Sequence, residues 1–188
     1  MKNIYEECPV LKNDRFILRK TELSDADDLL RVYSDKNALP FFNSDNCNGD
    51  NFYYTTKERM LEALEFWNLA YDNKWFARLS VLDAANNEVI GTIEGCIRAS
   101  DDAFNDCGIL RLDLGSKYEK TCAIADIMSV ILKDFYDLFG CESIITKVPV
   151  YAIERESAAK ESGFVKSDEL MIGNNDGYAY KDYWIIHK

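Results

Sequence analysis

The segment from Gly115 to Ala123 holds the groups in this chain that are best suited to bind a phosphate. An apolar strand pattern, GILRLDLG, leads into it, and an amphipathic helix pattern follows. A strand that runs into a helix N-terminus presents backbone amides to an anion, and Lys117 and Lys120 add positive charge. Glycines, which let a ligand approach such a backbone closely, are absent between Ser116 and Ala123. The segment therefore predicts a phosphate site with an unusual loop.

A second interpretation of the same residues is a helix cap. Ser116 and Glu119 have the spacing of a capping box, in which each side chain bonds to the backbone amide of the other residue. The helix would then begin near Lys117, and its first amides would be partly committed to the cap. The residue chemistry slightly favours this cap, and the sequence leaves both interpretations open.

The surrounding patterns predict a single domain over residues 1–188, in which strands and helices alternate. Strands are expected at residues 15–19, 75–82, 88–97, 109–114 and 144–150, with two more near 164–172 and 178–187. Helices are expected from about Ser24, over 56–71, between the polar loop and Gly140, and over 152–162. Gly91 and Gly95 predict a bulge or a close approach to the strand that contains them.

Composition excludes several classes of function. The net charge of −11 disfavours nucleic-acid partners and favours cationic ones, although it also serves solubility alone. The six cysteines form no CxxC pair and the only histidine is His187, so no metal site is expected. No apolar run is long enough to span a membrane, and the N-terminus has no signal core. These features predict a cytoplasmic protein with reduced thiols.

The order of elements resembles that of the GNAT acetyltransferase superfamily, and within it the ribosomal-protein N-terminal acetyltransferases. The resemblance covers nearly the whole chain. It is carried by RFILRKTELSDADDLL, NNEVIGTIEG, LRLDLGSKYEKTCAIADIMS and AAKESGF, in that order. It implies an α+β (α/β) fold with a mixed central sheet and about four flanking helices. The parallel strands at 109–114 and 144–150 would splay apart.

The resemblance also implies an N-acetyltransferase that uses acetyl-CoA as co-substrate, with direct attack by an amine on the thioester. The acceptor would be a protein or peptide N-terminus or a small amine, and a homodimer is compatible with the fold. Backbone groups of Leu112 and Leu114 would pair with the pantetheine arm. The groups expected to hold the pyrophosphate belong to Lys117, Lys120, Thr121, Cys122 and Ala123.

The chain departs from the pattern of the superfamily at the phosphate loop, which normally reads Arg/Gln-x-x-Gly-x-Gly/Ala. Glu119, Cys122 and Ile124 stand at the three defining positions. Ala152 and Ala159 stand where many members carry an asparagine and a tyrosine. The alternative function is therefore a GNAT-fold binding or interaction module that has lost acetyl-CoA binding. That alternative predicts side chains that fill the cleft, whereas the enzyme predicts an open splay and free amides near 120–123.

The strand carboxylates Glu94 and Asp113 are the main candidates for a catalytic base, and Glu142 is a third candidate that also fits a surface turn. A base must accept a proton from the acceptor ammonium, directly or through water, and a raised pKa suits that task. Glu94 lies on a predicted central strand, and Asp113 alternates with apolar neighbours. For both residues, the alternative to a catalytic role is that of a solvated strand carboxylate. Tyr53, Tyr54 and Trp75 are candidates for an acceptor pocket wall, or else for the core.

Overall fold

A mixed sheet of eight strands forms the centre of the molecule in the computed structural model, which describes residues 3–188. The strand order is β1-β2-β3-β4-β5-β6-β10-β7. The strands are β1 (Leu11–Lys12), β2 (Phe16–Lys20), β3 (Ala77–Asp83), β4 (Val89–Ile97), β5 (Gly108–Leu114), β6 (Ser143–Lys147), β7 (Val165–Lys166) and β10 (Tyr183–His187). A separate hairpin pairs β8 (Met171–Ile172) with β9 (Ala179–Tyr180).

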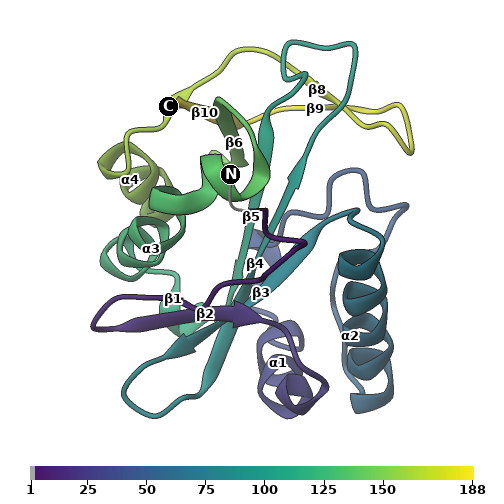
Figure 1. Ribbon diagram of the computed structural model, residues 1–188, viewed down its shortest axis with the longest axis vertical. Coiled ribbons are helices and arrows are strands. Elements are labelled where there is room, and N and C mark those ends of the chain that lie inside the picture. Colours follow the sequence, from purple (N-terminus) through teal and green to yellow (C-terminus); the bar gives the residue numbers. More distant parts are fainter. Residues whose placement is uncertain (1–2) are drawn as a thin grey trace.

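Helices cover both faces of this sheet (Figure 1). On one face lie α1 (Ala26–Tyr33) and α2 (Lys57–Asp72), and on the other lie α3 (Thr121–Phe139) and α4 (Ile153–Glu161). Helix α3 contributes the apolar stripe that its sequence predicts, and it ends at Gly140, whose φ of 72° is left-handed. The predicted single domain with a mixed sheet and four helices is confirmed.

Strands β5 and β6 are parallel neighbours that separate after a short paired stretch. Their register contains only Gly108↔Ile144 and Ile109↔Ile145, although β5 continues to Leu114. Strand β6 ends at Lys147, earlier than the expected residue 150, because Pro149 cannot donate a ladder hydrogen bond. The predicted splay between two parallel strands is therefore present.

The alternation of hydrogen bonds along β5 determines which backbone groups face the splay. The Gly115 amide donates to the Ile90 carbonyl at 2.9 Å, which marks a hydrogen-bonded pair in the antiparallel β4–β5 ladder. In such a ladder, alternate residues direct their amide and carbonyl toward the partner strand, and the residues between them direct theirs away from it. Leu112 and Leu114 therefore direct theirs away from β4, toward the gap left by β6.

Gly95 allows α3 to approach β4 closely, as its position within a strand predicted. A Cβ atom there would lie 2.3 Å from Cζ of Phe139. Changing Gly95→Ala is expected to lower the free energy of unfolding by about 1–3 kcal/mol, because the ring must move within a packed core. Gly115→Ala is the control, since its Cβ would meet nothing closer than 3.6 Å. Urea unfolding should show a change within about 0.5 kcal/mol for the control; equal losses in both variants would contradict the prediction.

The C-terminal end of the chain is divided into more strands than the sequence predicts. The two strands expected near residues 164–172 and 178–187 are four short ones, β7 to β10. Asp182, with a φ of 68°, interrupts the second of them.

Among residues 3–188, no helix has the length and apolar character that crossing a membrane requires.

Candidate functional site

The first turn of α3 lies beside the open end of the splay. The helix begins at Thr121, and Ser116–Tyr118 form a separate 3-10 turn. The Ser116 side chain caps neither element, and its amide donates instead to Asp35 at 3.0 Å. The predicted capping box with a helix start near Lys117 is therefore wrong. Tyr118 and Glu119 bond locally to Gly115 and Ser116, so the loop turns before the helix starts.

The amides of this turn are only partly engaged. The Thr121 amide donates to the Glu154 carboxylate of α4 at 2.8 Å. In the described chain, no hydrogen bond reaches the amides of Cys122 and Ala123, which at the start of a helix have no intrahelical partner. Lys120 is exposed, and its Nζ lies 4.0 Å from Glu154. Of the predicted pyrophosphate residues, Lys120, Thr121, Cys122 and Ala123 thus lie at this helix end, where one acidic side chain is already present, whereas Lys117 lies in the preceding 3-10 turn.

The unusual loop residues play different structural roles. Cys122 is exposed, so its side chain points away from the packed interior. Ile124 is 1% exposed and belongs to the core beneath α3. A glycine at position 124 would consequently remove core packing instead of merely restoring a loop.

Glu119 forms a buried ion pair with Arg155 of α4. The Arg155 Nε donates to Glu119 Oε2 at 2.9 Å and its Nη2 donates to Oε1 at 2.5 Å. Both side chains are about 5% exposed. The Arg155 guanidinium also lies 5.8 Å from the ring of Phe41, which follows α1. This pair therefore connects the segment before α3 to the first turn of α4.

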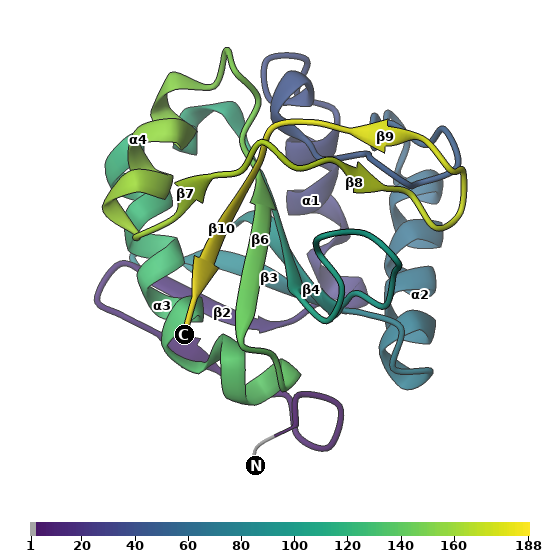
Figure 2. The same cartoon turned by 90° about the horizontal axis from the view of Figure 1, so that it is seen from above.

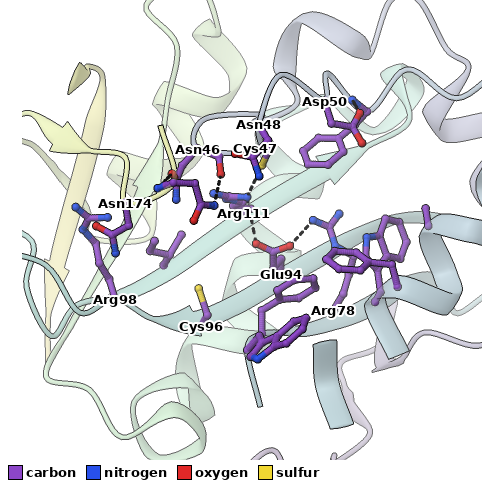
Figure 3. Close-up of a pocket in the computed structure, with 18 of the residues that line it drawn as sticks. Asn46, Cys47, Asn48, Asp50, Arg78, Glu94, Cys96, Arg98, Arg111 and Asn174 are labelled. Carbon is purple, nitrogen blue, oxygen red and sulfur yellow. Dashed lines mark hydrogen bonds and ion pairs between the residues drawn. The ribbon is translucent and has the colours of Figure 1, made fainter. Parts of the chain in front are cut away.

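A row of charged side chains crosses the opposite face of the sheet. Arg78 of β3, Glu94 of β4 and Arg111 of β5 are successive cross-strand partners. Arg78 Nη2 donates to Glu94 Oε2 at 2.5 Å, and Arg111 Nη1 lies 3.3 Å from Glu94 Oε1. Figure 3 shows Glu94 between the two guanidiniums. Glu94 is 5% exposed and Arg78 2%, so this is a buried ionic network.

Asp113 belongs to the same network one row further along. Arg78 Nη1 donates to Asp113 Oδ2 at 3.1 Å, and the hydroxyl of Tyr33 donates to the same oxygen at 3.0 Å. Asp113 is 1% exposed, and its Oδ1 has no partner in the described chain. The two candidate bases are therefore held by one shared arginine.

The environment of Glu94 favours its ionised form. Burial raises the pKa of the Glu94 carboxyl, but the Arg78 and Arg111 guanidiniums outweigh burial and hold the pKa below its ordinary value. This shift is opposite to the one that makes a carboxylate an efficient general base near neutral pH.

A pocket of about 600 Å³ opens above this row (Figure 3). Glu94, Arg78 and Arg111 lie in its floor, and rings from α2 and from the segment just before β3 form one wall. The exposed rings of that wall are Phe66 and Trp75, whose centroids are 6.4 Å apart. The volume falls in the range of small-molecule and peptide sites.

A strained loop and a hairpin tip close the pocket on its other side. Asn46, Asn48 and Phe52 have φ angles of 61°, 54° and 60°, which are unusual for residues with a side chain. The Asn175 amide donates to Asn46 Oδ1 at 2.7 Å, so the tip of the β8–β9 hairpin is tied to this loop. Figure 2 shows the hairpin extending toward the α2 side of the molecule. Of the three aromatic residues predicted for a pocket wall, Tyr54 and Trp75 line this pocket and Tyr53 does not.

Sequence analysis missed the two arginines of the row. Their signal was the alternation of polar residues in three strands: Arg78 with Ser80, Thr92 with Glu94, and Arg111 with Asp113. Residues two apart share a face of a strand, so each pair predicts a polar stripe. The missing information was the register that aligns the three stripes.

Acid is expected to destabilise the protein through carboxylates such as Glu94 and Asp102. Burial raises the pKa of Asp102, but the Ile172 amide and the Arg98 guanidinium outweigh it and lower the pKa to about 2. A carboxyl whose pKa is lowered by folding stabilises the folded protein at any pH above its unfolded-state pKa, which is near 4. This stabilisation is lost as the pH falls through the folded-state pKa. Asp102→Asn should cost about 1 kcal/mol at neutral pH after solvent screening. Urea unfolding between pH 7 and pH 2.5 should show this gap closing in acid; a gap that is constant with pH would contradict the assignment.

Comparison with known proteins identifies solved structures with a similar fold. No family model and no curated protein sequence matches the chain. The ribosomal-protein-S5-alanine acetyltransferase from Vibrio fischeri has a similar structure, with a TM-score of 0.68, 17% identity and coverage of 96% of both chains. A GNAT-family acetyltransferase from Bacillus anthracis has a TM-score of 0.67 at 15% identity, covering 95% of this chain and 98% of that chain.

A third similar structure contains ligands. The microcin C7 self-immunity acetyltransferase MccE, solved in complex with acetyl-CoA and AMP, has a TM-score of 0.68 at 14% identity and 94% coverage of both chains. The agreement extends over nearly the whole chain in each case, and one of the three structures is a ribosomal-protein acetyltransferase. This chain therefore has the fold of the GNAT acetyltransferases.

Proposed function

We propose that this protein is an N-acetyltransferase that transfers an acetyl group from acetyl-CoA to an amine. The observation that carries the proposal is the meeting of two features at the end of β5. On one side, the backbone groups of Leu112 and Leu114 face an open splay beside the start of α3. On the other side, Arg111 of the same strand lies in the floor of the pocket. A donor at the open edge of β5 and an acceptor on its α2 face could therefore approach the same strand.

The backbone in this region suits the pantetheine and phosphate groups of acetyl-CoA better than the side chains do. Leu112 and Leu114 would pair with the pantetheine arm, and the amides of Cys122 and Ala123 would meet the pyrophosphate with Lys117, Lys120 and Thr121 beside them. Acetyl-CoA supplies the activated acetyl thioester that the amine attacks. Glu154 and the Glu119–Arg155 pair oppose binding by occupying neighbouring space.

The acceptor would lie in the pocket over Glu94. Because Glu94 stays ionised, we assign to it the orientation of the acceptor amine or of a bound water. Asp113 would hold Arg78 and Tyr33 in place and so fix the position of Glu94. The exposed rings of Phe66 and Trp75 favour an acceptor with an apolar or aromatic part. A small amine and a peptide N-terminus both satisfy these conditions.

Isothermal titration with acetyl-CoA and with free CoA tests the donor half of this proposal. A dissociation constant in the micromolar range, equivalent to about 7–8 kcal/mol, is expected. Mass spectrometry of reactions with amines and short peptides then tests transfer, with Glu94→Gln as the variant that should lose it. No binding at millimolar CoA would overturn the proposal.

A GNAT-fold binding module is the second candidate, and a specific observation favours it. The buried Glu119–Arg155 pair and the bond from the Thr121 amide to Glu154 place two carboxylates beside the helix end that a donor's diphosphate would use. Under this function the chain binds neither acetyl-CoA nor CoA, while the pocket over Glu94 still takes a ligand. The titration above separates the two candidates.

A further inference from the structure

The carboxylate of Glu154 engages the donors that an anion would use at the start of α3. Its Oε2 accepts from the Thr121 amide at 2.8 Å and from the Thr121 hydroxyl at 2.5 Å. Its Oε1 lies 4.0 Å from Lys120 Nζ. A helix-terminal amide, a hydroxyl and a lysine together form a common set of phosphate ligands. The chain thus supplies its own anion to this helix end.

The two acids near this helix end differ in how firmly they are held. Glu119 is buried and fully paired with Arg155 in a bidentate contact. Glu154 is much more exposed, and only Thr121 and the exposed Lys120 hold it. Moving Glu154 into solvent breaks no buried contact, whereas moving Glu119 would strand a buried arginine. Glu154 is therefore the acid that an incoming ligand can displace.

We infer that Glu154 acts as an internal substitute for phosphate and sets the affinity of the α3 N-terminus for the diphosphate of an acyl donor. This inference rests on the proposed function for the identity of the donor. A diphosphate must compete with the carboxylate for the Thr121 amide, and it also meets the negative charge of that carboxylate. Both effects weaken donor binding, and both disappear when Glu154 is replaced by alanine.

Two variants separate the effects of contact and charge. Glu154→Ala removes the competing acceptor and its charge, and Glu154→Gln removes only the charge. Glu156→Ala is the matched control, because Glu156 is also acidic in the first turn of α4 and pairs with Lys160 on the surface. Circular dichroism and thermal unfolding of all three variants establish that each is folded.

Titration with three probes tests the inference without measuring catalysis. Inorganic pyrophosphate and CoA are expected to bind Glu154→Ala about tenfold more tightly than the unaltered protein, with a smaller gain for Glu154→Gln. Pantetheine, which has no phosphate, should bind all variants equally. Glu156→Ala should behave like the unaltered protein with every probe.

The outcomes distinguish this inference from the proposed function. If pyrophosphate gains affinity in Glu154→Ala while CoA binds no variant, the inference holds and the acetyl-CoA proposal fails. If neither pyrophosphate nor CoA gains affinity, the inference is overturned, whatever the unaltered protein binds. A gain that pantetheine or Glu156→Ala shares equally would also overturn it, because a general change of charge or shape would then explain the effect.

Discussion

Changing Arg78→Met is expected to lower the free energy of unfolding by about 3–5 kcal/mol, the usual loss when one partner of a buried ionic network is removed. Arg78 is 2% exposed and donates to Glu94, to Asp113 and to the Tyr33 hydroxyl. Without it, two carboxylates remain buried, and only Arg111 lies close to one of them. The guanidinium also stacks over Trp67 at 4.4 Å, a contact that methionine replaces only in part.

The control for this variant is Arg31→Met. Arg31 pairs with Asp28 on the surface, and its side chain is 60% exposed, so its removal should change stability by less than about 0.5 kcal/mol. Urea unfolding of both variants at neutral pH provides the comparison. A loss below about 1 kcal/mol for Arg78→Met would show that the network adds little to stability.

The pH dependence of the same variant provides an independent check. In the unaltered protein the lowered pKa of Glu94 makes its ionised form stabilising above the unfolded value. Without Arg78, burial becomes the stronger effect on Glu94 and raises its pKa. Ionisation then destabilises the variant as the pH rises, so the gap to the unaltered protein should be wider at pH 8 than at pH 4.

Local sequence patterns predicted the parts of the fold that depend on neighbouring residues. The apolar stripe of α3 and the stop at Gly140 are properties of one segment, and both were found within a few residues of the expected positions. The start of α3 was not predicted correctly, because the S-x-x-E pattern of Ser116 and Glu119 is equally a local signal. Glu119 instead pairs with Arg155, which is 36 residues away in sequence and invisible to a local pattern.

The candidate site illustrates the same limit for charged residues. Glu94 and Asp113 were predicted as strand carboxylates, and both face a polar row of the sheet. Their connection through Arg78 depends on the register of three strands, which no single strand specifies. The contact between Thr121 and Glu154 likewise requires α3 and α4 to begin side by side. Residue type thus indicated which charged groups could take part in chemistry. Only the packing of distant segments showed which partners already pair with those groups.

Breaking the Glu119–Arg155 pair is expected to have the second large effect on stability. Arg155→Met leaves Glu119 buried without a partner and should cost about 3–5 kcal/mol. Glu119→Gln leaves the guanidinium with weaker acceptors and should cost a similar amount. The double variant removes both charges, so its loss should be smaller than the sum by about 2–3 kcal/mol.

A double-mutant cycle measured by urea unfolding gives this coupling energy. The Glu156–Lys160 pair is the matched control on the same helix, since it is exposed and should couple by less than about 0.5 kcal/mol. Additive losses at positions 119 and 155 would mean that the pair contributes no stability of its own.

Because the pair fills the space between the starts of α3 and α4, the folded double variant should also bind CoA more tightly if that space is the donor entrance. Strong coupling without any gain in CoA affinity would assign the pair to folding alone and would remove it as support for the binding module.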